Sequence, residues 1–362
     1  MKVLMCGSIA DSGGESTHTK QVISNLVNLG VAVDLYGIRT ANGTSVLLSN
    51  CRKIIQRTAG IFYYTLRKRE DFDILHIQSS GGLGSFVSGV TGVIAGKLCR
   101  KPVIITFHYS KTLEFIESHR RVFKFVLENA TKLILVSGKQ LEAVKKTFPE
   151  FASKLEQIPN GFDPEVFFSR NRNECRKILN VPLDKTVIFN ISNLTKSKGH
   201  RFLIEAIHEI PTSDNDVVCY IAGKGEQYSQ LVDQIGDYNL QDRISLLGWI
   251  PDEQIPIWLN ACDFFVMPSC AEGNPIVMFE CLGCGTPYVG TSVGGVPEII
   301  ISNQYGLLVK PGDITDLAEK IIAGMSMEWD RTAILRHAGQ YTWENIAIKI
   351  MGIYSDMSTT PA

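Results

Sequence analysis

The sequence has no uninterrupted apolar run of the roughly 18 residues that a membrane-spanning helix requires. It also has no low-complexity tract and no short internal repeat. The apolar stretch near its start, Val3–Cys6, is too short for the core of a signal peptide and is typical of a buried strand. We therefore expect a globular protein that is kept in the cytoplasm.

The nine cysteines follow no framework spacing, and their number is odd. Several lie in or beside apolar stretches, as Cys6, Cys175 and Cys219 do, where a thiol behaves as a small hydrophobic group. Such usage is typical of a reducing compartment. Cys281 and Cys284 have the spacing of a zinc or redox pair, but no second pair or His cluster accompanies them. We therefore expect no metal and no other cofactor.

Charge is nearly balanced over the 362 residues but unevenly spread. Residues 1–165 hold 21 Lys and Arg against 14 Asp and Glu, a net charge of +7, and the remainder carries −8. A basic half joined to an acidic half indicates that the two halves meet different ligands, although solvated helix faces also explain it. No recognised nucleic-acid-binding module accompanies the basic half, so nucleic acid is not an expected partner.

Short apolar runs alternate with longer amphipathic runs along the chain, which is long enough for two cores. The strands predicted in the first half are Lys2–Met5, Ala32–Tyr36, Ile74–Ile77, Val103–Phe107 and Leu133–Val136. The helices predicted there include Thr19–Leu29, Phe86–Leu98 and Gln140–Thr147. After a polar stretch, Ser169–Arg176, taken as the linker region, the predicted strands are Thr186–Ile191, Val217–Ile221, Ile244–Leu247, Phe264–Met267 and Pro287–Gly290. The chain closes on the predicted helices Asp316–Gly324 and Trp343–Ser355.

This alternation predicts an α/β protein with two doubly wound parallel sheets and a cleft between the two domains. In such sheets, ligands bind beyond the carboxyl ends of the strands. Gly13-Gly14 stands between the first strand and the first helix, where glycines let backbone amides approach a phosphate, although many such loops are only tight turns. His108 directly follows the strand Val103–Phe107 and is either a structural hydrogen-bonding group or a group that meets substrate.

The most specific pattern is the segment Glu272–Glu280. Two carboxylates eight residues apart would be separated by about 12 Å of rise if both lay on one helix. The helix N-terminus would offer unpaired amides to a diphosphate, with Glu272 near a sugar and Glu280 near ribose hydroxyls. The alternative is a surface helix with two solvated acids. Lys198, in the loop after Thr186–Ile191, would neutralise a departing phosphate, or it is a solvated loop residue.

Taken together, these motifs resemble the retaining glycosyltransferases of the GT-B fold, of the group 1 and family 4 type. The resemblance covers nearly the whole chain, and the Glu272–Glu280 block with the following Gly294-Gly295-Val296-Pro297-Glu298 is its most specific part. The weaker parts are Gly13-Gly14, Phe107-His108, Ser137, Pro159–Asp163, Lys198-Gly199, Gly223–Gly225, Leu247-Gly248, Pro268-Ser269, Gly285–Pro287 and Tyr341–Trp343.

The resemblance implies a role for each matching position. The amide of Gly14 would touch the donor diphosphate, His108 would contact the transferred sugar, and Lys198 would offset charge on the leaving group. Glu272 would bind sugar hydroxyls and Glu280 the ribose. The backbone is implied to hold the donor at Asn274, Pro275 and Ile276 and the base at Trp249 and Ile250. The position of Asn193 commonly holds an Arg in the family, so one cation is missing, and Arg201 or backbone amides would have to substitute for it.

The resemblance also implies a domain plan and an activity. Residues 1–168 would form the acceptor domain and residues 169–342 the nucleotide-sugar domain, with a helix at about 343–357 packing back on the first. The expected enzyme moves a hexose or N-acetylhexosamine from a UDP- or GDP-sugar to an acceptor hydroxyl, with retention of configuration, in polysaccharide or glycolipid synthesis. The alternatives are a nucleotide-sugar epimerase or hydrolase of the same fold and a non-catalytic nucleotide-sugar-binding partner.

A cluster of basic and apolar residues in the first half suggests peripheral contact with an anionic membrane, where a lipid-linked acceptor would lie. The basic members are Arg52, Lys53, Arg57, Arg67, Lys68 and Arg69, and the apolar ones are Ile54, Ile55, Ile61, Phe62, Tyr63 and Tyr64. The alternative is that Ile54–Tyr64 packs against the first sheet and the charges are merely solvated.

Overall fold

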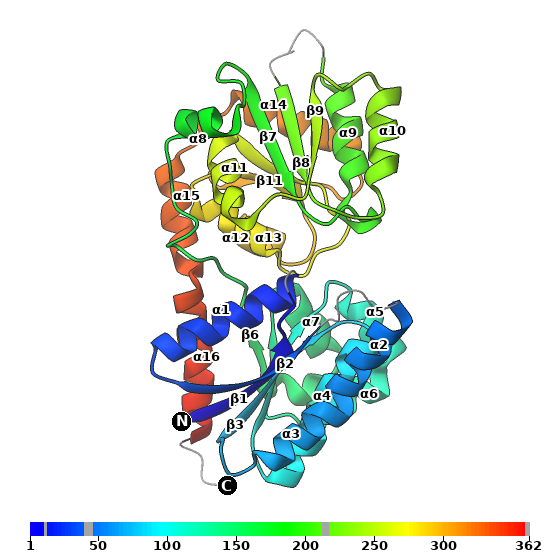
Figure 1. Cartoon of the computed structure of the whole chain (residues 1–362), viewed down its shortest axis with the longest axis vertical. Helices are drawn as coiled ribbons and strands as arrows, with labels where there is room; N and C mark the ends of the chain where they lie inside the picture. Colours follow the sequence, from blue (N-terminus) through cyan, green and yellow to red (C-terminus); the bar gives the residue numbers. More distant parts are fainter. Residues whose placement is uncertain (11–12, 40–45, 212–216, 359–362) are drawn as a thin grey trace. The chain divides into compact units, whose positions relative to one another are not determined.

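The computed structural model describes residues 1–10, 13–39, 46–211 and 217–358. They form two compact units: Met1–Asn160 with Trp343–Ala362, and Gly161–Thr342 (Figure 1). Each unit is built on a six-stranded sheet whose strands are all parallel. This confirms the predicted fold class of two α/β domains with parallel sheets.

The first sheet has the strand order β2-β1-β3-β4-β5-β6. Its strands are β1 (Lys2–Ser8), β2 (Ala32–Ile38), β3 (Ile74–Ser80), β4 (Val103–His108), β5 (Lys132–Leu135) and β6 (Leu155–Gln157). The helices of this unit are α1 (Gly14–Asn28), α2 (Val46–Ile55), α3 (Ile61–Arg67), α4 (Leu83–Cys99), α5 (Thr112–Ser118), α6 (Arg120–Asn129), α7 (Gly138–Thr147) and α16 (Trp343–Ser358). A π-helical turn, Gln56–Gly60, joins α2 to α3, and a 3-10 turn, Pro149–Lys154, precedes β6.

The two faces of the first sheet differ in polarity because alternate residues of a strand point to opposite faces. One face carries Leu75 and Ile77 of β3 and Ile105 and Phe107 of β4, which form a core with α3, α4, α6 and α7. Helices α1 and α16 pack against each other (Figure 1). On the face of the sheet opposite this core, the hydroxyl of Tyr354 of α16 is hydrogen-bonded to His76 of β3.

The second sheet has the strand order β12-β11-β10-β7-β8-β9. Its strands are β7 (Thr186–Ile191), β8 (Val217–Ala222), β9 (Ile244–Gly248), β10 (Phe264–Met267), β11 (Tyr288–Thr291) and β12 (Gly306–Val309). Its helices are α8 (Arg172–Leu179), α9 (His200–Glu209), α10 (Tyr228–Asp237), α11 (Ile255–Ala261), α12 (Ile276–Gly283), α13 (Val296–Ile299), α14 (Ile314–Ser326) and α15 (Arg331–Ala338). The 3-10 turns are Lys196–Lys198, Asp252–Gln254 and Gly339–Tyr341.

Both faces of the second sheet are apolar, as a parallel sheet covered on both sides requires. Val187 and Phe189 of β7 point into a core with α11, α12 and α15. Ile188, between them in sequence, points into the opposite core with α9, α10 and α14. The near-continuous apolar strands of this half therefore reflect burial on two sides.

The boundary between the units differs from the predicted one at residues 168 and 169. The chain leaves the first unit after Asn160 and returns to it at Trp343. Phe162 belongs to the second unit because its amide donates to the carbonyl of Tyr341 and its ring lies against Gly283. The expected linker is also wrong in part, since α8 begins at Arg172 within it.

Buried polar contacts explain why α8 is ordered. Arg176 is 3 % exposed, and its guanidinium pairs with Asp263 at 2.6 Å and donates to the carbonyl of Ala261. Arg172 pairs with the other oxygen of Asp263 at 2.6 Å, so two ion pairs anchor a charged stretch that the sequence suggests to be a linker. Within the described residues, no helix is both long and apolar enough to cross a membrane.

Candidate active site

Lys198 lies beyond the carboxyl end of β7, in the 3-10 turn that precedes α9. The turn is closed by Gly199, which has a left-handed φ of 70° and approaches the carbonyl of Pro268 so closely that a Cβ atom would lie 2.0 Å from its oxygen. This contact brings the turn against the loop that follows β10. The Lys198 ammonium donates to Oε1 of Glu272 at 2.6 Å, and the two side chains are 24 % and 9 % exposed.

Glu272 does not lie on a helix, which corrects the prediction that a single helix would carry both carboxylates. Helix α12 begins at Ile276, after Pro275 in an extended conformation. A proline disfavours the helical conformation in the residue before it, so the helix cannot extend back through Asn274 to Glu272. Instead the loop is fixed by Gly294, whose Cβ would meet the carbonyl of Glu272 at 2.0 Å.

The N-terminus of α12 has no side-chain cap, and its first turn contains no acidic residue. Asn274 and Pro275 are buried beside it, and Ile276 is its first residue. The first amides of a helix have no partner within the helix, and the helix dipole favours a negative charge there. The predicted residues Asn274, Pro275 and Ile276 therefore lie where an anion can be bound by backbone amides.

Glu280 lies one turn into α12 and is half-buried. Among the described residues, no hydrogen bond or ion pair holds its carboxylate. Burial, and then the negative charge of Asp252, raise the pKa of Glu280 to about 8. The sequence interpretation missed Asp252, which is exposed in the turn before α11. A half-buried carboxylate without partners among the described residues is well placed to accept hydrogen bonds from a ligand's hydroxyl groups.

Three further predicted residues lie at the same carboxyl edge of the second sheet. Asn193 is exposed in the loop after β7, and Ile250 is buried after β9. Trp249 is 59 % exposed, with the ammonium of Lys224 5.2 Å from its ring centroid. Arg201, considered as a substitute cation, is exposed on α9 with its guanidinium over the ring of Phe202.

Gly14 and His108 lie in the first unit. Gly14 is the first residue of α1, which starts five residues before the predicted Thr19. The early start is held by local bonds: the Ser8 amide donates to Glu15, and the Ser16 hydroxyl donates to the carbonyl of Ala10. Asp11 and Ser12 of the glycine loop lie outside the described residues. The Gly14 amide thus stands at a helix N-terminus, as the phosphate-binding interpretation requires.

His108 ends β4 and is half-buried, and its Nε2 lies 2.8 Å from Oε1 of Gln78 on β3. Burial, followed by the neighbouring His18 and His76, lowers the pKa of His108 well below 6.5, so the ring is neutral near pH 7. Gln78 and His76 were not singled out from the sequence. The signal was present, since the polar residues His76 and Gln78 alternate with the apolar Leu75 and Ile77 along the strand.

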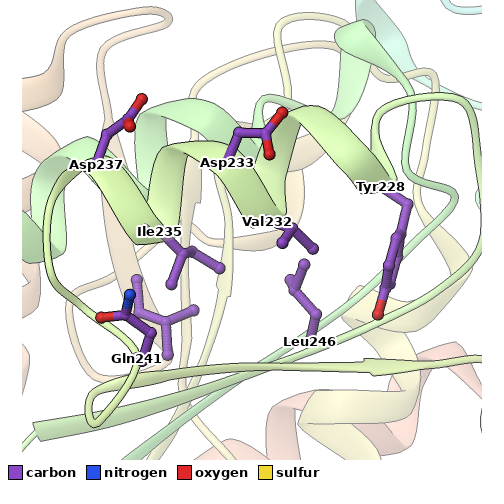
Figure 2. Close-up of a pocket in the computed structure, with 9 residues that line it drawn as sticks. Tyr228, Val232, Asp233, Ile235, Asp237, Gln241 and Leu246 are labelled. Atoms are coloured by element: carbon purple, nitrogen blue, oxygen red, sulfur yellow. The ribbon is translucent and has the colours of Figure 1, made fainter.

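A cavity of about 660 Å³ lies elsewhere in the second unit, between α10 and the edge strand β9. Figure 2 shows Tyr228, Ile235 and Leu246 directed into it, while the carboxylates of Asp233 and Asp237 point away. The described lining residues include none of the predicted site residues, and the polar groups that would orient a ligand do not converge on it. We therefore place the candidate site at the carboxyl edge around Lys198 and Glu272.

Comparison with known families and proteins identifies the family of the chain. The family described as Glycosyl transferases group 1 matches residues 171–340, and Glycosyltransferase Family 4 matches residues 12–166. The chain is 30% identical over 274 residues to the Escherichia coli UDP-Gal:alpha-D-GlcNAc-diphosphoundecaprenol alpha-1,3-galactosyltransferase, covering 72% of this chain and 68% of that protein. It is 24% identical over 361 residues to an uncharacterized glycosyltransferase of Methanocaldococcus jannaschii, covering 96% and 95% of the two chains.

Solved structures show the same fold. Sucrose-phosphate synthase from Thermosynechococcus elongatus superposes with a TM-score of 0.80 and 19% identity, covering 98% of each chain. Anabaena HepE in complex with UDP-glucose gives a TM-score of 0.76 and 22% identity over 98% of this chain and 100% of that one. Both superpositions extend over nearly the whole chain, which confirms the GT-B fold.

Proposed function

The chain belongs to the group 1 glycosyl transferases, and we propose that it moves a hexose or N-acetylhexosamine from a UDP- or GDP-sugar to an acceptor hydroxyl with retention of configuration. The proposed setting is the synthesis of a cell-envelope glycan or glycolipid. One observation carries the proposal: the Lys198–Glu272 ion pair lies just ahead of the uncapped N-terminus of α12, and one turn into that helix stands Glu280, whose carboxylate has no partner among the described residues. This set fits a nucleoside diphosphate joined to a polyhydroxylated group.

The diphosphate and the ribose of such a donor can each be bound by groups of this set. Lys198 has three N–H donors, and Glu272 accepts one of them, so others remain for a diphosphate oxygen. The amides of Ile276 and its neighbours add donors aimed at the same charge. Glu280 can accept the ribose hydroxyls. The names of two similar proteins support a uridine nucleotide: the E. coli relative uses UDP-Gal, and HepE was solved with UDP-glucose.

Cleavage of the donor builds negative charge on the departing diphosphate and positive charge at the anomeric carbon. Preorganised donors at the developing charge are usually the largest contribution to catalysis. In the proposed reaction the acceptor oxygen bonds to the anomeric carbon from the leaving group's face while the bond to the diphosphate breaks. A phosphate oxygen of the leaving group takes the acceptor's proton. His108, which is neutral, contacts the transferred sugar and is not a proton carrier in this scheme.

A metal ion is not needed in this proposal because Lys198 and the α12 amides supply the positive potential. Transfer should therefore proceed in 5–10 molar equivalents of EDTA over any added divalent ion, about as fast as without chelator. The measurement is the release of UDP or GDP from a panel of nucleotide sugars, with and without acceptors. Loss of transfer in EDTA that Mg²⁺ or Mn²⁺ restores would overturn the proposed source of charge stabilisation.

The acceptor is proposed to be presented at an anionic membrane surface. Leu48, Ile54, Ile55 and Tyr63 on α2 and α3 are exposed by 46–66 %, whereas Ile61 is buried against the first sheet. Arg52 is exposed among them. The predicted patch is smaller than the sequence indicates, because two of its basic residues are paired with acids: Lys68 with Asp34 and Asp71, and Arg69 with Glu70.

Four basic residues, Arg52, Lys53, Arg57 and Arg67, have no ion pair within the described part of the chain. Each is worth about 1 kcal/mol near an anionic surface and acts within a Debye length of about 8 Å at physiological salt. Exposed apolar side chains interleaved with these charges are typical of interfacial helices. The name of the E. coli relative, whose acceptor is a diphosphoundecaprenol lipid, supports the same location for the acceptor.

Sedimentation with liposomes tests this surface. We expect binding to vesicles that contain 30–40% anionic lipid, no binding to neutral vesicles, and loss of binding near 0.5 M salt, where the Debye length is roughly 4 Å. The double substitution Ile54→Asp and Ile55→Asp should abolish sedimentation. Ile178→Asp, which changes an equally exposed side chain on α8 of the other unit, is the matched control and should bind normally. Equal binding by both variants would locate the contact elsewhere.

A further inference from the structure

A row of polar side chains lies on the face of the first sheet opposite its apolar core. His76 and Gln78 of β3 and Thr106 of β4 are completely or almost completely buried, and His108 stands at the end of the row. Nε2 of His108 is bonded to Oε1 of Gln78 at 2.8 Å. Nε2 of His76 lies 2.8 Å from the Thr106 hydroxyl. A buried polar group without a hydrogen-bond partner is energetically costly, so each donor in this row is expected to face an acceptor.

Gln78 has little freedom to move. Its side-chain carbons lie so close to Gly7 of β1 that a Cβ atom there would approach them to 2.9 Å. Its amide has two different ends, one a pure acceptor and one a pure donor. The donor end, Nε2, faces the acceptor Sδ of Met5 at 3.3 Å, and it lies 3.4 Å from Nε2 of His76, which can accept from it in one of the two His76 tautomers. The acceptor end, Oε1, is thereby left directed at His108.

The same orientation is consistent with the remaining contacts of His76. If its Nε2 accepts from Gln78 and Thr106, its Nδ1 carries the proton and donates to the hydroxyl of Tyr354 at 2.6 Å. Every member of the row then has a donor facing an acceptor. The reversed Gln78 amide would place its oxygen against the Met5 sulfur, which has no proton to donate.

This arrangement determines the protonation of His108. An oxygen that only accepts must face an N–H, so the proton of the neutral ring is on Nε2 and the lone pair is on Nδ1. The edge of the His18 ring, 4.4 Å from His108 between centroids and inclined at 67°, limits rotation from the other side. His18 is itself held by a bond from its Nδ1 to Oδ1 of Asn160 at 2.8 Å.

We propose that Gln78 is a positioning residue that fixes the ring of His108 as the Nε2–H tautomer, so that Nδ1 presents a hydrogen-bond acceptor to a hydroxyl group of the transferred sugar. The inference rests on the role of His108 in the proposed function, and it adds a chemical selectivity. The substrate group that meets His108 must be a donor, such as a hydroxyl. A carboxylate or another group that only accepts would be rejected.

The tautomer can be measured without any substrate. Long-range nitrogen NMR of ¹⁵N-histidine-labelled protein distinguishes protonated from unprotonated ring nitrogens, and His108→Ala assigns the signal. We expect protonated Nε2 and unprotonated Nδ1 for His108 in the wild type at pH 7.5. In Gln78→Leu we expect the two tautomers to be mixed. A wild-type ring protonated at Nδ1, or an unchanged pure tautomer in Gln78→Leu, would overturn the assignment.

Turnover measurements distinguish a positioning role of Gln78 from a role in packing alone. Gln78→Leu should lower kcat by about 10–100-fold, because misplacing a substrate-orienting group has effects of this order, while the KM for donor changes by less than about threefold. Gln78→Glu keeps an acceptor oxygen toward Nε2–H of His108, and its second oxygen can accept from His76 once that ring carries its proton on Nε2 and accepts from the Tyr354 hydroxyl at Nδ1. This variant should recover kcat to within about fivefold of the wild type at pH 8. A purely structural role predicts the opposite order, since a buried carboxylate disturbs packing more than Leu does.

Gln78→Glu should also introduce a pH dependence. The new carboxylate faces His108 together with His18 of α1 and His76 of β3, and it favours the imidazolium, which has no lone pair to offer. We expect kcat of this variant to fall as the pH is lowered below 8, where the wild type shows no such step. Thr106→Val removes a bond to His76 without touching His108, and it should keep the tautomer and kcat within about twofold.

The result for His108→Ala tells the two proposals apart. If this substitution leaves turnover intact, the role given to His108 in the reaction fails, whatever the tautomer is. If it lowers turnover but Gln78→Glu is as impaired as Gln78→Leu, the function stands and the positioning role of Gln78 is wrong.

Discussion

Replacing Lys198 with Met is expected to lower turnover by about 10²–10³-fold, the effect typical of removing one preorganised group from a developing negative charge. The nucleotide should still bind, because Glu280 and the α12 amides remain. The loss should therefore fall mainly on kcat, and the KM for donor should change less than tenfold. Lys196→Met, in the same 3-10 turn and exposed, is the matched control and should stay within about threefold of the wild type.

The ion pair complicates this experiment in a way that can be resolved. Without the ammonium, the carboxylate of Glu272 is left mostly buried and unpaired, and an unsatisfied buried group of this kind destabilises the fold by about 1–3 kcal/mol or more. The double variant Lys198→Met with Glu272→Gln should regain part of that stability and none of the activity. Recovery of activity together with stability would mean that Lys198 only supports the loop.

Replacing Glu280 with Gln is expected to weaken UDP or GDP binding by roughly 10–100-fold at pH 8. This corresponds to the 1.5–3 kcal/mol of hydrogen bonds made to a charged acceptor. The same change should raise the melting temperature at pH 8, because it removes a carboxylate that the fold desolvates without a partner. Calorimetry and thermal unfolding measure the two effects. Glu253→Gln, in the turn next to Asp252, is the control and should change neither.

The raised pKa of Glu280 also predicts how binding depends on pH. Ribose hydroxyls bond best to the ionised carboxylate, so nucleotide binding expels a proton whenever Glu280 starts protonated. Affinity for UDP or GDP should rise between pH 6 and about pH 8 and then level off. Glu280→Gln should lose this rise. Unchanged affinity in a folded variant, or a pH dependence that survives the substitution, would remove Glu280 from the nucleotide site.

The pH dependence of folding stability is opposite to that of nucleotide affinity. The folded-state pKa of Glu280 lies above its ordinary value of 4.5, so the folded protein holds this proton more tightly than the unfolded chain does. The contribution of this group to stability is therefore fully present below about pH 4.5 and is lost as the pH rises through 8. The stabilising effect of Glu280→Gln should accordingly be larger at pH 8 than at pH 6.

The fold was largely predictable because burial on both sides of a parallel sheet leaves strong apolar runs in the sequence. The bounds of β7 and β10 agree with the predicted Thr186–Ile191 and Phe264–Met267. The strands that were missed, β6 and β12, have three and four residues and lie at sheet edges. An edge strand pairs with one neighbour only, and these two strands are defined by that pairing.

The sequence predicted site residues that stand in loops marked by Gly and Pro. It did not predict contacts between residues that only the tertiary fold brings together. Lys198 and Glu272 could each be singled out from their loops, but their ion pair arises because Gly199 and Gly294 bring distant loops together. Gln78 escaped notice because an amide inside an apolar strand has no function on its own. Its significance comes from the strand register that pairs Ser80 with His108 and sets Gln78 on the same face.

The configuration of the product tests the central claim most directly. The purified protein is incubated in EDTA with a nucleotide sugar of known anomeric configuration and an acceptor alcohol, and the anomeric proton of the product is followed by NMR. The account predicts a glycoside with the configuration of the donor, formed together with one equivalent of UDP or GDP and only when acceptor is present. An inverted glycoside would contradict the proposed mechanism, and free or epimerised sugar formed without acceptor would contradict the proposed transfer itself.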